Sequence, residues 1–261
     1  MSDEDVQEYD DDLLDVLETV WGEGFLSPGG VDEVDAYLEG IDLGGKSVLD
    51  IGCGVGGVDL HLVKAHGARM VTGIDVECDL IPRCQRLAEK YDISNAVEFS
   101  CVEPGPLPFG DNAFDIVTSK DSIIHILDKV ALAADIHRVL APGGWFVASD
   151  WLCGFDAPSP EMQAYVEAEG LDFGLATVQV YIDAMQAAGF VDIDTTDRNS
   201  WYRETARSER DQLAGEHFEQ LSAAVGEEFL RHQIDVWDKM IVALDQGQLR
   251  PTHLRGRKPD A

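Results

Sequence analysis

The sequence is poor in basic residues. Its 261 residues include 19 lysines and arginines against 50 aspartates and glutamates, which gives a formal net charge of −31 at pH 7. Proteins that bind nucleic acids or anionic membranes need lysine and arginine to neutralise phosphates. We therefore expect neither as a partner. The acidity could attract cationic ligands, but most of the acids lie in expected helices and loops away from the site described below, which favours a solvated acidic surface.

The chain also lacks the patterns of exported, membrane-spanning and cysteine-stabilised proteins. No apolar run reaches about 18 residues, and the opening MSDEDVQEYDDD has neither a basic nor an apolar signal region. The five cysteines form no C-x-x-C pair and are odd in number. We therefore expect a cytoplasmic protein with no disulfide framework and no metal site.

The strongest pattern is KSVLDIGCGVGG, residues 46–57. Its β-branched apolar run predicts a buried parallel strand, and its glycines turn the backbone before a helix begins at Val58. Gly52, Gly54 and Gly57 also satisfy the weak GxGxxG dinucleotide pattern. Asp50 argues against a dinucleotide, because its carboxylate would repel a pyrophosphate but attract the ammonium and sulfonium groups of S-adenosylmethionine (SAM).

Strands and helices alternate at short spacing beyond this loop, which predicts an α/β protein with a doubly wound, mostly parallel seven-stranded sheet, helices on both faces and a helical cover. The strands expected after the first are 68–75, 96–102, 114–118, 145–151, 190–195 and 251–258.

We expect one integrated catalytic domain with three parts. They are an N-terminal helical lid at 1–45, a SAM-binding core at 46–156, and substrate-covering helices with the last strands of the sheet at 157–261.

The D-x-G-x-G-x-G pattern from Asp50 to Gly56 resembles the first motif of the class I SAM-dependent methyltransferases. The resemblance implies a Rossmann-like fold with ligands at the carboxyl ends of the strands. Asp75 has the spacing at which an acid meets ribose hydroxyls, and Glu103 could accept from the adenine amino group. The expected donor-binding residues are Asp50, Gly52, Gly54, Gly56, Asp75, Val76, Glu103 and Ser119.

Two further stretches, EYDDDLLDVLETVWGEGFLSPGG at 8–30 and SKDSIIHILDK at 119–129, are similar to the phosphoethanolamine N-methyltransferases. In that family a tyrosine and a histidine form a catalytic latch over the transfer site, and an aspartate helps to hold the substrate amine. The matching residues are Tyr9, His125 and Asp121, and the resemblance also places Ser27 near the cofactor.

This resemblance implies N-methylation of a small amine, with phosphoethanolamine or its methylated forms as the leading candidates and S-adenosylhomocysteine as the product. An imidazole suits removal of the amine proton, so His125 is the expected base. The family grips the phosphate with tyrosines, an arginine and a lysine, and its lysine falls at about Met240 here. The expected substrate-binding residues are Tyr165, Tyr181, Arg198, Trp201, Tyr202 and Lys239.

Other functions stay open. The acceptor could be another small zwitterion, such as an amino acid, a betaine precursor or a sulfur compound, with Arg198 or Arg203 holding its carboxylate. The chain could instead bind SAM without turnover. An NAD-dependent oxidoreductase is disfavoured by Asp50. The sequence does not indicate an oligomeric state.

Overall fold

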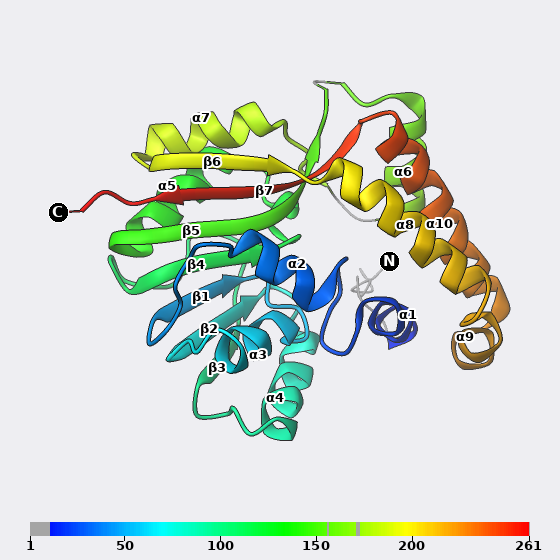
Figure 1. Cartoon of the computed structure of the whole chain (residues 1–261), viewed down its shortest axis with the longest axis horizontal. Helices are drawn as coiled ribbons and strands as arrows, with labels where there is room; N and C mark the ends of the chain where they lie inside the picture. Colours follow the sequence, from blue (N-terminus) through cyan, green and yellow to red (C-terminus); the bar gives the residue numbers. More distant parts are fainter. Residues whose placement is uncertain (1–10, 156, 171–172, 261) are drawn as a thin grey trace, which may run out of the picture.

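A seven-stranded sheet forms the centre of the protein in the computed structural model, which describes residues 11–155, 157–170 and 173–260 (Figure 1). The strand order is β3-β2-β1-β4-β5-β7-β6. Strands β1 to β6 run in one direction, and β7 runs antiparallel to its neighbours β5 and β6. The strands are β1 (Ser47–Ile51), β2 (Met70–Asp75), β3 (Val97–Cys101), β4 (Phe114–Lys120), β5 (Leu140–Cys153), β6 (Val191–Asp197) and β7 (Leu249–Arg257). The expected mostly parallel seven-stranded sheet is confirmed.

Helices cover both faces of the sheet. The side chains of β1 alternate, so Val48 packs into one core cluster and Leu49 into the other. The cluster around Val48 includes residues of α2 (Gly30–Tyr37), α3 (Gly57–Lys64) and α4 (Ile81–Lys90). The opposite cluster includes residues of α5 (Lys129–Val139) and α7 (Val178–Ala188). Burial on both faces explains why the strands read as continuous apolar runs.

A separate group of helices lies beyond the carboxyl ends of the parallel strands, on the right in Figure 1. Its members are α1 (Asp11–Trp21), α6 (Pro160–Glu169), α8 (Asn199–Ala214), α9 (Phe218–Val225) and α10 (Glu227–Asp245). Helices α8 and α9 end at Gly215 and Gly226, and the helices of this group share an apolar cluster of their own. The N-terminal and C-terminal helices therefore meet over the edge of the sheet where ligands bind in such folds.

Cys78 and Cys101 form a disulfide, a single link that the sequence did not predict, since we expected no disulfide framework. Cys78 begins the short helix η1 (Cys78–Leu80), and Cys101 ends β3. Asp75 is the register partner of Cys101, which brings the chain after β2 close to the end of β3. Cysteine spacing along the sequence does not reveal this proximity, because it arises from parallel strand pairing.

None of the helices in the described part of the chain is long and apolar enough to cross a membrane.

Candidate active site

The glycine loop after β1 is the expected donor-binding element and lies next to Leu26, a residue that lines the cavity described below. Gly52, Gly54 and Gly56 have φ values of 77°, 54° and 93°, a left-handed region that side chains disfavour. A side chain at Gly52 would also collide with Ser122, and one at Gly57 with the backbone of Gly24. The loop therefore needs glycine both for its turns and for close contact with neighbouring segments.

Asp50 and Asp59 lie next to this loop as buried carboxylates, with 1% and 0% exposure. Among the described residues, no lysine, arginine or histidine forms an ion pair with either. Burial, and then the charge of Asp59, raises the pKa of Asp50 well above its ordinary value. A cationic ligand would relieve this cost, so the residues present fit the ammonium and sulfonium groups of SAM.

Asp75 ends β2 beside the same loop. Its carboxylate accepts hydrogen bonds from the backbone N–H groups of Gly54 at 2.8 Å and Glu77 at 3.0 Å. Burial raises its pKa, although these bonds oppose the shift. Each oxygen keeps a lone pair that could accept from a ribose hydroxyl. Val76, half exposed, and the exposed Glu103 follow on the ends of neighbouring strands.

Lys120 fastens the loop at residues 22–29 to the end of β4. Its Nζ donates to Ser27 Oγ at 2.6 Å, to the Pro28 carbonyl at 2.8 Å and to Asp121 Oδ2 at 2.9 Å. The side chains of Lys120 and Asp121 are only 2% and 6% exposed. Ser149 Oγ donates to the other Asp121 oxygen at 3.0 Å. The expected donor residue Ser27 and the expected substrate residue Asp121 are thus held by one buried cation that sequence reasoning missed.

Ser119, the residue before Lys120, is buried and donates from Oγ to the Ile51 carbonyl at 2.7 Å. This bond ties the ends of β4 and β1 together.

His125 ends the short helix η2 (Ile123–His125), which two buried groups hold in place. Asp150 accepts from the Ile124 N–H at 3.0 Å and from the Tyr181 hydroxyl at 2.5 Å. Lys129 Nζ donates to the carbonyls of this turn, at 2.7 Å for Ile123 and 2.5 Å for Ile126. Burial raises the pKa of Asp150 to about 7. Because Tyr181 donates to Asp150, which in turn accepts from Ile124, Tyr181 supports this turn indirectly.

A cavity of about 120 Å³ lies between this turn and the helical cover. His125, Asp121 and Ser27 contribute to its wall from the sheet side. The other lining residues are Leu13, Leu17, Trp21, Leu26, Pro28, Ile124, Trp151, Tyr165, Glu169, Phe173, Tyr202, Gln233, Val236, Trp237, Met240 and Leu249. The wall is thus largely aromatic and aliphatic, with carboxylates as its charged groups.

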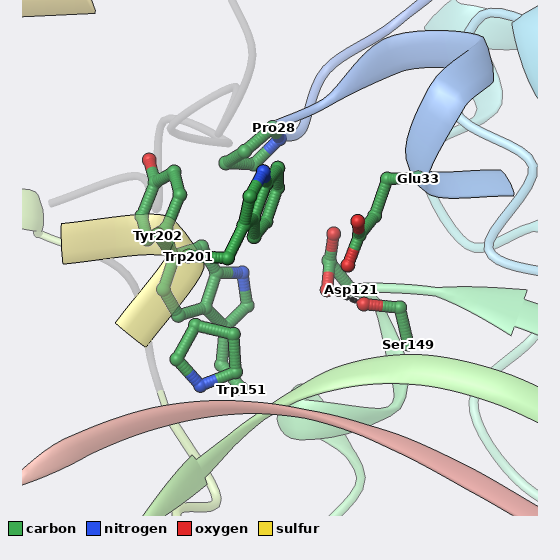
Figure 2. Close-up of a pocket in the computed structure, with 8 residues that line it drawn as sticks. Pro28, Glu33, Asp121, Ser149, Trp151, Trp201 and Tyr202 are labelled. Atoms are coloured by element: carbon green, nitrogen blue, oxygen red, sulfur yellow. Dashed lines mark hydrogen bonds between the residues drawn. The ribbon is translucent and has the colours of Figure 1, made fainter. Parts of the chain in front are cut away.

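A smaller pocket adjoins the cavity and shares Pro28, Asp121, Trp151 and Tyr202 with it. Figure 2 shows the rings of Trp151, Trp201 and Tyr202 on one side and the carboxylates of Asp121 and Glu33 on the other. Aromatic rings and acids therefore face each other across the pocket.

The residues expected to bind substrate are in different places. Tyr165 and Tyr202 line the cavity, and Trp201 lines the smaller pocket. Tyr181, by contrast, bonds to Asp150. Lys239 pairs with Asp235 one turn earlier on α10. Tyr9 lies outside the described residues.

Arg198 is committed to Glu33. Its Nε and Nη2 donate to the two Glu33 oxygens at 3.0 Å and 2.7 Å, and His253 Nε2 lies 2.6 Å from the same carboxylate. Burial raises the pKa of Glu33, but the hydrogen bonds from His253 and Arg198 outweigh burial and hold this pKa below its ordinary value. Arg198 is therefore already neutralised by a buried partner.

Outside the site, Asp35, His61 and His66 form the group of possible metal ligands found among the described residues. Both histidine Nε2 atoms lie within 2.8 Å of Asp35 Oδ1, as expected for ion pairs. This group lies on α2, α3 and the turn after α3, and contributes no atom to the cavity.

Comparison with known proteins gives consistent matches. Residues 49–148 match a family model described as a methyltransferase domain. Phosphoethanolamine N-methyltransferase 1 of Arabidopsis thaliana is 34% identical over 200 residues, which cover 76% of this chain and 40% of that protein. Phosphoethanolamine N-methyltransferase of Plasmodium falciparum (isolate 3D7) is 27% identical over 211 residues, which cover 79% of this chain and 77% of the relative. The chain spans less than half the length of the plant relatives.

Solved structures share the fold. Phosphoethanolamine N-methyltransferase 2 of Haemonchus contortus, in complex with phosphomonomethylethanolamine and S-adenosylhomocysteine, superposes with a TM-score of 0.90 at 24% identity. That match covers 98% of this chain and 60% of the other. A putative sarcosine dimethylglycine methyltransferase from Galdieria sulphuraria gives a TM-score of 0.80 at 20% identity, covering 96% and 98%.

Proposed function

Because the chain carries a class I methyltransferase domain that uses SAM and resembles the phosphoethanolamine N-methyltransferases, we propose that it methylates the nitrogen of a small amine. The observation that carries this proposal is the meeting of two features at one edge of the sheet. A glycine loop lies beside the buried, uncompensated Asp50, and His125 and Asp121 line a cavity under the helical cover.

The residues next to the loop would hold the donor. Asp50 offers a carboxylate to its cationic groups, and Asp75 can accept from ribose hydroxyls while its two backbone bonds keep it in place. The bound donor supplies an activated methyl group on sulfur. Methyl transfer then requires an unprotonated nitrogen aligned with that methyl group and protected from water.

The cavity residues would prepare the acceptor. His125 is the group we propose to take the proton from the incoming ammonium, since an imidazole works near neutral pH. Asp121 would attract the amine and stabilise the cationic product. The apolar wall from α1 and α10 would exclude water. Tyr9 remains our proposed partner of His125 in closing the site.

The acceptor itself has two candidates. The names of the relatives favour phosphoethanolamine and its methylated forms. The cavity wall favours an amine without a phosphate, for the reasons given in the next subsection.

The test is transfer of labelled methyl from SAM to a panel of amines, with His125→Ala and, as a matched control, the exposed His232→Ala. We expect His125→Ala to lose at least about 100-fold in kcat while SAM affinity stays within about twofold. Full kcat in this variant would reject His125 as the base. SAM binding with no methylated product from any acceptor would instead indicate a protein that binds the donor without turnover.

A further inference from the structure

The charges around the cavity bear on which amine it accepts. Its charged lining residues are Asp121 and Glu169, and no lysine or arginine of the described residues lines it. The remaining residues, 1–10, 156, 171, 172 and 261, include no lysine or arginine in the sequence. A phosphate group carries nearly two negative charges and is bound in proteins by cationic donors. The cavity offers it none.

Two cations near the cavity and the smaller pocket, Lys120 and Arg198, are already bound elsewhere. Lys120 donates to Ser27, Pro28 and Asp121, and Arg198 forms a paired contact with Glu33. Redirecting either one to a phosphate would take a cation away from a buried carboxylate, which is costly. Met240, an uncharged residue, lines the cavity, and its sulfur lies 3.8 Å from the Tyr202 hydroxyl.

Six aromatic side chains form a box around the same space: Trp21, Trp151, Tyr165, Phe173, Tyr202 and Trp237. Ring centroids are 5.6 Å apart for Trp21 and Trp237 and 5.0 Å apart for Trp151 and Tyr202. Aromatic faces attract alkylammonium ions, most strongly when water is excluded. A cavity of about 120 Å³ has room for a small organic molecule.

A buried glutamate organises this box from behind. Glu209, 5% exposed, accepts hydrogen bonds from Trp21 Nε1 at 2.8 Å, Tyr202 Oη at 3.0 Å and Trp237 Nε1 at 3.2 Å. It therefore fixes three rings in orientation and adds negative potential behind them. Glu169, at the end of α6, adds a second carboxyl to the wall itself.

We propose that the acceptor is a small alkylamine without a phosphate, held as its ammonium by the aromatic box together with Asp121, Glu169 and Glu209. This inference rests on the proposed N-methyltransferase function and specifies its substrate class. Burial raises the pKa of Glu169 to about 7 and also raises that of Glu209. A cation in the cavity would favour the ionised form of both carboxyls. Both glutamates would therefore carry more negative charge when the cavity holds a cation than when it is empty.

The experiment compares matched pairs that differ only in the phosphate. Choline and phosphocholine are titrated against the protein saturated with S-adenosylhomocysteine, with tryptophan fluorescence as the signal. Ethanolamine and phosphoethanolamine are compared as methyl acceptors. We expect the unphosphorylated member of each pair to be favoured at least about 100-fold, since an unpaired phosphate would have to be desolvated.

A pair of variants tests whether the lack of a cation in the cavity wall causes the preference for the unphosphorylated amine. Met240→Lys adds a cation to the cavity wall, and Val242→Lys adds the same charge on the same helix at a position that is 43% exposed. Met240→Lys should reduce the preference by tenfold or more, whereas Val242→Lys should leave it unchanged.

The outcomes separate the two proposals. Tighter phosphocholine binding, or faster methylation of phosphoethanolamine, by the unmodified protein would overturn the substrate class and leave N-methylation standing. Absence of choline binding would also overturn the substrate class. Saturable choline binding without methylation of any amine would support the box and reject the proposed enzymatic function.

Discussion

Replacement of Lys120 by methionine is the sharpest test of how the site is held together. Methionine keeps most of the apolar length of the side chain but removes three hydrogen bonds to Ser27, Pro28 and Asp121. The Asp121 side chain, 6% exposed, would then keep its contact with Ser149 but lose its cation. Breaking a buried ion pair on one side costs about 3–5 kcal/mol.

That loss of unfolding free energy is large enough to measure by urea unfolding or as a change in Tm. For a protein of this size, 1 kcal/mol corresponds to roughly 2–4 °C in Tm, so Lys120→Met should lower Tm by about 10 °C. Because Ser27 lies on the segment that Lys120 anchors, SAM affinity should fall as well. The exposed pair of Lys90 and Glu23 provides a control, and Lys90→Met should barely move the transition.

The double variant Lys120→Met with Asp121→Asn tests whether the broken ion pair causes the loss of stability in Lys120→Met. Removing the second charge relieves the unpaired carboxylate, so the double variant should be more stable than Lys120→Met alone. If the lysine variant loses less than about 1 kcal/mol, or if the second substitution only adds to the damage, the role given to Lys120 is wrong.

Three further predictions follow from other buried groups. Tyr181→Phe leaves Asp150 short of one hydrogen bond and should cost about 1–3 kcal/mol in urea unfolding, with kcat reduced more than SAM affinity; equal stability would contradict the supporting role. Cys101→Ser opens a link between residues 23 apart and should cost about 3 kcal/mol, and a reducing agent should shift the midpoint of the unmodified protein but not that of the variant. Burial raises the pKa of Glu169 from 4.5 to about 7, so its contribution to stability is full below pH 4.5 and is lost as pH rises through 7. Stability should therefore decline between pH 5 and pH 8, and Glu169→Gln should make this decline smaller by at most about 3 kcal/mol, with the rest coming from other buried carboxyls such as Asp150.

The features predicted correctly from sequence are those that local patterns determine. The apolar run at β1 and the positive-φ glycines after it are local signals, and the strands around β2, β4 and β5 follow the same alternation. One strand, β5, is longer than the sequence predicts. The strand was expected at 145–151, but β5 (Leu140–Cys153) also includes the APGG segment at residues 141–144.

The features missed depend on partners far apart in the chain. Glu33 reaches Arg198 and His253, and Glu209 reaches Trp21, with separations of 165, 220 and 188 residues. A charged residue in an amphipathic helix looks solvent-facing until its partners are known. Arg198 was expected to bind substrate because of the family resemblance, and the sequence alone does not show the Glu33 carboxylate that pairs with it.

The position of β7 bears on how the molecule can be assembled during translation. This strand lies between β5 and β6 although it follows both in the chain, and it pairs with β5 along nine residues. Until the ribosome has released β7, the edge of β5 stays open and β6 has no neighbour in the sheet. Strands β1 to β5, which carry the glycine loop, can pair early. Strand β6 can join the sheet only after β7 has inserted between β5 and β6. Chaperones that shield exposed strand edges would matter most in that interval.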